Sequence, residues 1–210
     1  MRRTERNIII FGCGGVGSWV ALYLAKKQLN KDVDLNLTLI DFDIIEEKNM
    51  ERQFFNINDI SCSKTTQLKS SIRRHGLSTA NILAKNLKIE KKEELLQFDN
   101  NSVAILCTDN AKSKILISKY FNKFIIVNCD YDFVEVKSQF EEDELKMWDI
   151  NNGGYSNRQN INSNLKAALI VLNLFDNNLR LRFEKFKIVT TVESEMQKMV
   201  RAGNLVGDVE

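Results

Sequence analysis

A glycine-rich turn is the first group of residues in this chain whose types and spacing suit a chemical task. Gly12, Gly14, Gly15 and Gly17 stand within six residues, directly after an apolar run, with Val16 between the last two. Glycines let a backbone approach a phosphate closely, and a helix that begins there offers free N–H donors. The turn therefore predicts a nucleotide-phosphate site, or else a tight strand-to-helix connection without a ligand. By itself it does not distinguish NAD from ATP.

Two acids, Asp41 and Asp43, follow the next apolar run, and Asp41 stands 24 residues beyond Gly17. An acid at the end of the second strand of such a unit can accept hydrogen bonds from ribose hydroxyls. This position favours a nucleoside-binding role. The alternative is a solvated pair of acids at a strand end.

A polar cluster after these acids distinguishes between NAD and ATP as the candidate nucleotide. Asn49, Arg52 and Gln53 come within a dozen residues of Asp41, and Lys64 follows Arg52 by twelve residues. Cations beside a nucleotide neutralise a triphosphate and the charge that gathers on it during transfer. A dehydrogenase has no need of them, so the cluster favours ATP. We expect Arg52 and Lys64 to be exposed; taken singly, each could also be an ordinary surface cation.

Asp109 and Asn110 follow the most apolar strand pattern of the chain, V-A-I-L-C at 103–107. In an open α/β sheet, ligands bind at the carboxyl ends of the strands. A carboxylate there can hold Mg²⁺ against ATP phosphates, because hard cations prefer oxygen ligands. The alternative is that Asp109 caps a helix that begins at Asn110.

The elements that must position these residues follow from apolar periodicity. The predicted strands are residues 7–11, 35–40, 81–89, 103–107, 124–128, 132–140 and, as late strands, 179–190. The predicted helices are residues 19–29, 63–74 and 110–120, and a last helix whose apolar face is Ile161, Leu165, Ala168, Leu169, Leu172 and Phe175. Alternation of strand and helix predicts an α/β class, Rossmann-like and doubly wound, with a mostly parallel sheet and late antiparallel strands.

Composition excludes several other classes of protein. The 210 residues carry a net charge of +2, which is not the balance of a strongly basic nucleic-acid binder. No apolar run reaches the roughly 18 residues of a membrane helix. The four cysteines show no C-x-x-C spacing, so we expect neither zinc nor disulfides and a cytoplasmic protein. We expect one domain over residues 1–192, with a strand and a long loop at 131–160, and a polar tail at 193–210.

The motifs together resemble the ThiF/MoeB family of ubiquitin-like-protein activating enzymes. The matching pieces are G-C-G-G-V-G-S (12–18), L-I-D-F-D (39–43), N-M-E-R-Q (49–53), Lys64 and C-T-D-N (107–110). They span about the first 130 residues. The stretch D-F-D-I-I-E-E-K-N-M-E-R-Q-F-F is particularly similar to short ThiF-type proteins of phages and plasmids.

The resemblance implies an adenylyltransferase that uses ATP and Mg²⁺, is a homodimer, and activates the C-terminal carboxylate of a ubiquitin-like (β-grasp) protein or peptide. It implies that the glycine turn cradles phosphates and that Asp41 holds the ribose. It implies that Asn49, Arg52 and Lys64 contact the triphosphate and that Asp109 holds the metal. Gln53, Asp43 and Asn110 belong to the same predicted nucleotide site.

Departures from the family pattern keep two alternatives open. Residues 141–160, where many members carry a transfer cysteine, contain none. We therefore predict that the chain forms no thioester of its own. The family's N-terminal arginine is missing, and only Arg2, Arg3 or Arg6 could replace it. The chain could thus be an inactive partner subunit of an activating enzyme. An NAD-dependent oxidoreductase is the other alternative.

Overall fold

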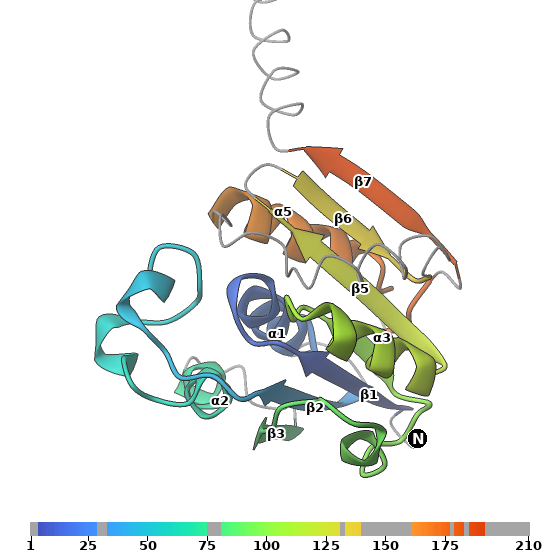
Figure 1. Cartoon of the computed structure of the whole chain (residues 1–210), viewed down its shortest axis with the longest axis horizontal. Helices are drawn as coiled ribbons and strands as arrows, with labels where there is room; N and C mark the ends of the chain where they lie inside the picture. The colour runs from blue at the N-terminus through green and yellow to red at the C-terminus, as the bar shows by residue number, and fades with distance from the viewer. Residues whose placement is uncertain are drawn as a thin grey trace, which may run out of the picture.

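The computed structural model describes residues 4–28, 33–74, 81–130, 133–139, 161–176, 179–182 and 185–191. Within them, seven strands form one sheet in the order β3-β2-β1-β4-β5-β6-β7 (Figure 1). The strands are β1 Thr4–Phe11, β2 Val33–Asp41, β3 Asn81–Asn86, β4 Val103–Leu106, β5 Lys123–Cys129, β6 Phe133–Lys137 and β7 Lys187–Thr191. The first five are mutually parallel, whereas β6 and β7 each pair antiparallel to the strand before. The predicted fold class is confirmed.

Helices cover both faces of this sheet. They are α1 Gly15–Gln28, α2 Lys64–Arg74, α3 Ala111–Tyr120 and α5 Ile161–Asn173. Successive residues of a strand point to opposite faces, so Ile8 and Ile10 pack with α1, α2 and α5, while Ile9 and Phe11 pack with α3. All four of these β1 residues are buried, as the continuous apolar pattern of the strand predicts.

Helix α1 begins four residues earlier than the periodicity indicates. It starts at Gly15, so the second half of the glycine motif forms its first turn. Apolar spacing does not locate this boundary, because a glycine has no side chain and therefore does not show whether its position faces the core.

Helix α5 confirms the predicted face only in part, because Ala168 and Phe175 are buried but other predicted residues are not. Its buried residues are Ser163, Asn164, Ala167, Ala168 and Val171, whereas Ile161 and Leu169 are 40% and 55% exposed. The helix lies against α1. The small side chains of Ala167 and Ala168 allow this close approach, whereas Leu169 faces away from it.

The late strands are shorter than predicted. Among the described residues after α5, Lys187–Thr191 alone pairs in the sheet, as β7, while Phe175 and Leu181 form an isolated bridge. Leu179 has a positive φ of 56°, which a strand does not adopt. The predicted loop at 141–160 and the tail at 193–210 lie outside the described residues. No helix among those described has the length and apolar character to cross a membrane.

Candidate functional site

The glycine turn connects β1 to α1 and leaves no room for side chains at two positions. Gly12 has φ +92°, and a Cβ there would lie 2.6 Å from the Thr108 nitrogen. At Gly17 a Cβ would lie 1.8 Å from the Gly12 oxygen. Both glycines are thus required by backbone packing, which holds the turn tight against β4 and starts α1 at the pocket described below.

Asp41 ties the end of β2 to this turn. Its carboxylate accepts the Cys13 N–H at 2.7 Å and the Asp43 N–H at 2.9 Å. Burial raises the pKa of Asp41, while the charge of Lys64 and the two backbone N–H groups oppose that rise. The predicted ribose acid therefore also fixes the shape of the phosphate turn.

Lys64 is not the exposed cation that the sequence predicts. Its side chain is 8% exposed, and Nζ lies 2.7 Å from Oδ2 of Asp43, whose own side chain is 47% exposed. The Lys64 N–H also donates to the Asp43 carbonyl. The first residue of α2 is thus held against the end of β2, because a buried ammonium requires a partner.

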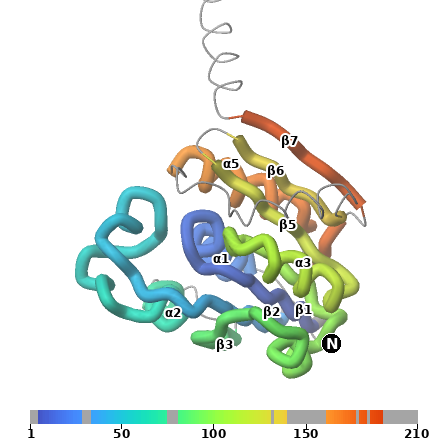
Figure 2. The backbone as a smooth tube through the Cα atoms, viewed as in Figure 1, coloured from blue at the N-terminus to red at the C-terminus, as the bar shows by residue number. Residues whose placement is uncertain are grey.

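A segment between β2 and α2 carries Asn49, Arg52 and Gln53 (Figure 2). It begins and ends at the isolated bridge between Ile44 and Ser63. The Asn49 side chain is buried and accepts the Glu46 N–H at 3.0 Å, so it stabilises the segment itself. Two short 3-10 turns, Glu47–Asn49 and Ile57–Asp59, fold the segment.

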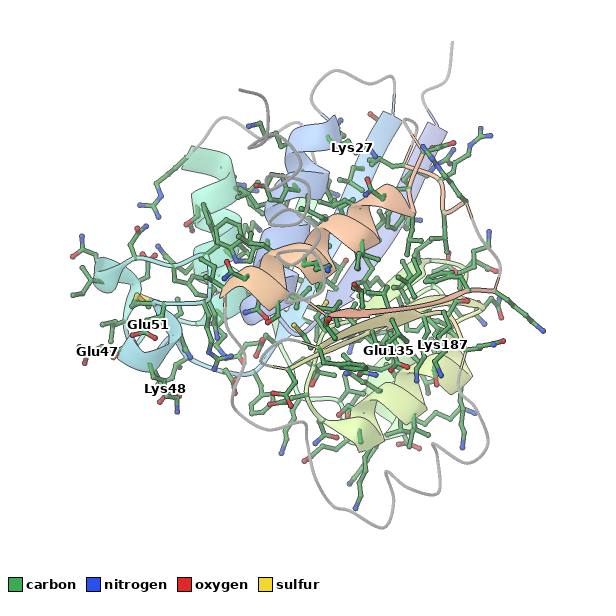
Figure 3. The ribbon with its side chains drawn as sticks, turned by 90° about the horizontal axis from the view of Figure 1, so that it is seen from above. Lys27, Glu47, Lys48, Glu51, Glu135 and Lys187 are labelled. Atoms are coloured by element: carbon green, nitrogen blue, oxygen red, sulfur yellow. The ribbon has the colours of Figure 1, made fainter. Side chains whose placement is uncertain are left out.

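The outer part of this segment is charged. In Figure 3, Glu47, Lys48 and Glu51 lie together at one end of the molecule, away from Glu135 and Lys187.

Arg52, in the same segment, is only half-buried. Gln53, in contrast, is 6% exposed, and its Oε1 has no hydrogen-bond partner among the described residues. Gln53 packs beside the glycine turn, where a Cβ on Gly14 would lie 3.5 Å from its Nε2.

Asn110, and not Asp109, caps α3. Oδ1 of Asn110 accepts the Ser113 N–H at 2.9 Å, as an N-cap residue does. Asp109 is exposed, and its carboxylate makes no hydrogen bond or salt bridge within the described part of the chain. The capping alternative for Asp109 is therefore wrong.

The residues present fit a Mg²⁺ ion that is shared with a nucleotide. Among the described residues, no group of three or more His, Cys, Asp or Glu side chains is arranged to hold a metal by itself. Mg²⁺ in nucleotide sites typically takes one or two carboxylates, with phosphate oxygens and water completing its coordination. The uncommitted Asp109 carboxylate is suited to that role.

One pocket of about 310 Å³ gathers nearly all of these residues at the carboxyl ends of the parallel strands. The predicted residues that line it are Gly12, Gly14, Gly15, Asp41, Asp43, Asn49, Arg52, Gln53, Lys64, Asp109 and Asn110. Val16 and Gly17 lie outside its wall, buried in the first turn of α1. Arg6 lies near the amino end of β1, whereas Phe11 at the other end of this strand lines the pocket, and Arg2 and Arg3 lie outside the described residues.

Sequence reasoning missed the apolar part of the pocket. Its residues are Phe11, Ile40, Phe42, Leu87, Ile89 and Ile117. Phe11 and Ile40 stand at or beside the last residue of a predicted strand, which is the signal that could have identified them. Lys88, which also lines the pocket, lies over the Phe42 ring at 5.2 Å from its centroid.

The four cysteines are free thiols in different surroundings. Cys107 lines the pocket, and burial raises its pKa to about 12. Cys129, at the end of β5, is 4% exposed, and burial raises its pKa to about 11. Cys13 is fully buried and Cys62 is exposed. Because the thiolate is the nucleophile, the raised pKa values disfavour the reactive form of Cys107 and Cys129.

A buried charged network behind the pocket was also missed. Lys114 is 2% exposed and donates to the Val127 carbonyl at 2.8 Å and to Oδ1 of Asn128 at 2.6 Å. Nδ2 of Asn128 donates to Glu135, which also pairs with Lys137 at 3.0 Å. Burial lowers the pKa of Lys114 to about 8, while the charges of Asp109 and Glu135 oppose that change. The network joins α3 to β5 and β6.

Comparison with known proteins decides the family. The model of the ThiF family matches residues 2–141, two thirds of the chain. The chain belongs to the ThiF family. This assignment confirms the resemblance seen in the motifs and favours adenylyl transfer over the oxidoreductase alternative.

Curated relatives of this ThiF-family protein are adenylyltransferases by name. A probable molybdopterin-synthase adenylyltransferase of Porphyra purpurea is 29% identical over 143 residues, 66% of this chain and 36% of its own length. Adenylyltransferase and sulfurtransferase MOCS3 of Xenopus laevis is 25% identical over 120 residues, 56% of this chain and 25% of its own. The chain therefore spans about a quarter to a third of these relatives.

Solved structures show the same fold at low sequence identity. E. coli MccB, crystallised with ATP, superposes with a TM-score of 0.70 and 19% identity, covering 90% of this chain and 60% of MccB. PaaA superposes with a TM-score of 0.63 and 19% identity, covering 82% of this chain and 63% of PaaA.

Proposed function

We propose that this protein is an ATP-dependent adenylyltransferase that activates the C-terminal carboxylate of a ubiquitin-like protein or peptide. The observation that carries the proposal is a pocket that gathers the glycine turn, Asp41, Arg52, Lys64 and Asp109. These residues stand at the last residue of β2, in the connections that follow β1, β2 and β4, and at the first residue of α2. Family membership and the names of the curated relatives support the same reaction.

The two sides of the pocket suit the two ends of ATP. The apolar side chains of Ile40, Ile89 and Ile117 provide a surface for a base. The glycine turn and the amino end of α1 offer backbone N–H groups to phosphate oxygens. We assign the ribose to Asp41, which lines the same pocket.

The reaction transfers the adenylyl group of ATP to the carboxylate. A carboxylate oxygen forms a bond to the α-phosphorus, and the bond from that phosphorus to the bridging oxygen of the β-phosphate breaks. The electron pair of that bond leaves with pyrophosphate, and the product is an acyl-adenylate. No proton is transferred, so the site needs positioned cations and N–H donors rather than a general base.

Arg52 and Lys64 would supply the positive charge on which this transfer depends. Within the described part of the chain, the Lys64 ammonium group, which has three N–H donors, makes one hydrogen bond, to Asp43. Lys64 can therefore keep Asp43 while it donates to a phosphate. Mg²⁺ bound at Asp109 would neutralise further phosphate charge.

The acceptor class is inferred from relatives. A structure of E. coli MccB contains the peptide MccA, and other relatives are molybdopterin-synthase and sulfur-transfer adenylyltransferases by name. We propose that this chain likewise takes a protein or peptide C-terminus. A homodimer and a cytoplasmic location remain predictions.

Calorimetry followed by pyrophosphate exchange tests the proposal. We expect ATP to bind more tightly with Mg²⁺ than without it, and NAD to bind poorly. Asp109→Asn should abolish the effect of Mg²⁺, whereas the exposed Glu51→Gln, outside the pocket, should not. Candidate peptides and β-grasp proteins should then stimulate ATP–pyrophosphate exchange. Tight NAD binding without ATP binding would contradict the proposal.

A further inference from the structure

Helix α5 carries a fully buried asparagine in its first turn. Asn164 is 0% exposed, and both ends of its carboxamide make hydrogen bonds. Nδ2 donates to the Arg52 carbonyl at 3.2 Å, across 112 positions of sequence. Oδ1 accepts from Sγ of Cys129 at 3.4 Å. One side chain therefore links α5, the end of β5 and the segment that carries Arg52.

The main chain around Arg52 is held from two helices. The Arg52 N–H donates to the Asn49 carbonyl within its own segment, and Asn164 binds the Arg52 carbonyl. Two residues later, the Phe54 N–H donates to Oγ of Ser18 on α1 at 3.2 Å. The segment is thus docked on α1 and α5, which contact each other.

A polar residue at this position needs an explanation. Burying an amide is unfavourable unless it is hydrogen-bonded, and an alanine would continue the small-residue face that Ala167 and Ala168 present. The hydrogen bond to Arg52 supplies the explanation, because Asn164 recognises a main-chain position in the proposed site.

We propose that Asn164 is a positioning residue that sets the place of Arg52 in the pocket. This inference rests on the proposed function, because it takes Arg52 as a ligand of the triphosphate. Asn164 does not line the pocket. It acts through the main chain of Arg52, and a shift of about 1 Å in such a group is enough to lower activity by about a hundredfold.

A double-mutant cycle on ATP affinity tests this, with calorimetry on the full chain. Arg52→Ala should weaken ATP binding by about tenfold or more, as expected for the loss of a charged hydrogen bond. Asn164→Ala should weaken it by about threefold to tenfold in the wild-type background. In the Arg52→Ala background it should have less than about a twofold effect, because residues that act through one another are not additive. Equal effects in both backgrounds would overturn the proposal.

A matched control separates positioning from packing. Ser163 is also 0% exposed in the same turn, and its side chain hydrogen-bonds to Cys129. Ser163→Ala should therefore leave ATP affinity within about twofold, whatever it does to stability. Asn164→Leu, which removes the same hydrogen bonds without opening a large cavity, serves if Asn164→Ala does not fold.

Hydrogen exchange gives a readout that does not depend on ATP. In Asn164→Ala, the amides of Gln53 and Phe54 should exchange at least about tenfold faster, while those of β5 stay protected. Unchanged amides at these two positions would overturn the positioning role even if ATP binds. Failure of the wild-type protein to bind ATP, with faster exchange in the variant, would reject the proposed function and retain the role of Asn164 in holding the segment.

Discussion

The Lys64 ammonium nitrogen lies 2.7 Å from Oδ2 of Asp43, and this pair joins the amino end of α2 to the end of β2. Lys64 is buried, whereas Asp43 is half exposed. The ammonium group therefore has a fixed place in the pocket wall. A lysine held in this way meets a phosphate without the loss of side-chain freedom that an exposed lysine incurs.

Lys64→Ala should slow adenylate formation strongly. Removing one such charged contact typically costs about 2.7–4 kcal/mol of transition-state stabilisation, or about a hundredfold to a thousandfold in rate. ATP–pyrophosphate exchange measures this. Lys26→Ala, an exposed lysine of α1 outside the pocket, is the control and should retain the wild-type rate. A Lys64→Ala enzyme as fast as this control would remove Lys64 from the reaction.

Substitution by alanine should destabilise the fold at Gly17 but not at Gly14. A Cβ at Gly17 meets backbone at 1.8 Å, so Gly17→Ala should destabilise the fold by about 3 kcal/mol or more. A Cβ at Gly14 meets only the Gln53 side chain at 3.5 Å, an ordinary contact, so Gly14→Ala should fold normally. Urea denaturation of both variants checks the contrast. Equal stability of the two would mean that the turn is not packed as described.

The buried Lys114 should make stability depend on pH on the alkaline side. Burial lowers its pKa from 10.5 to about 8, so the unfolded chain binds more protons than the folded one between these values. The contribution of Lys114 to stability should therefore rise with pH from about 8 to 10.5. Urea denaturation of wild type and Lys114→Met across this range isolates the effect. A difference between the two proteins that stays constant or falls with pH would contradict it.

No thioester should form on this chain. Burial raises the pKa values of Cys107 and Cys129, which leaves Cys62 as the exposed thiol among the described cysteines. Cys62 does not line the pocket. After incubation with ATP, Mg²⁺ and a carboxylate partner, a gel without reductant should show no covalent adduct. A reductant-sensitive band that disappears with Cys62→Ala would overturn this prediction.

The sequence predicted the sheet and most of the pocket because both depend on local patterns. The continuous apolar runs of β1 and β4 indicate strands whose side chains are buried on both faces of the sheet. The glycine turn, Asp41 and Asp109 each follow directly after such a run, and parallel strands bring their carboxyl ends to one edge. Strand identity and order along the chain were therefore enough to gather these residues in one place.

Partners far apart in sequence were decided only by the tertiary structure. Periodicity predicted Ala168 on the inner face of α5 but also Leu169, which is exposed, and it missed Asn164, whose burial depends on the hydrogen bond to Arg52. The burial of Lys64 and Lys114 also could not be predicted from the sequence. A cation is buried only where an oxygen atom compensates its desolvation, and that oxygen belongs to a residue far away in the sequence. A local pattern reports which face of an element is apolar, but the partner of a buried polar group is set by the packing of the whole chain.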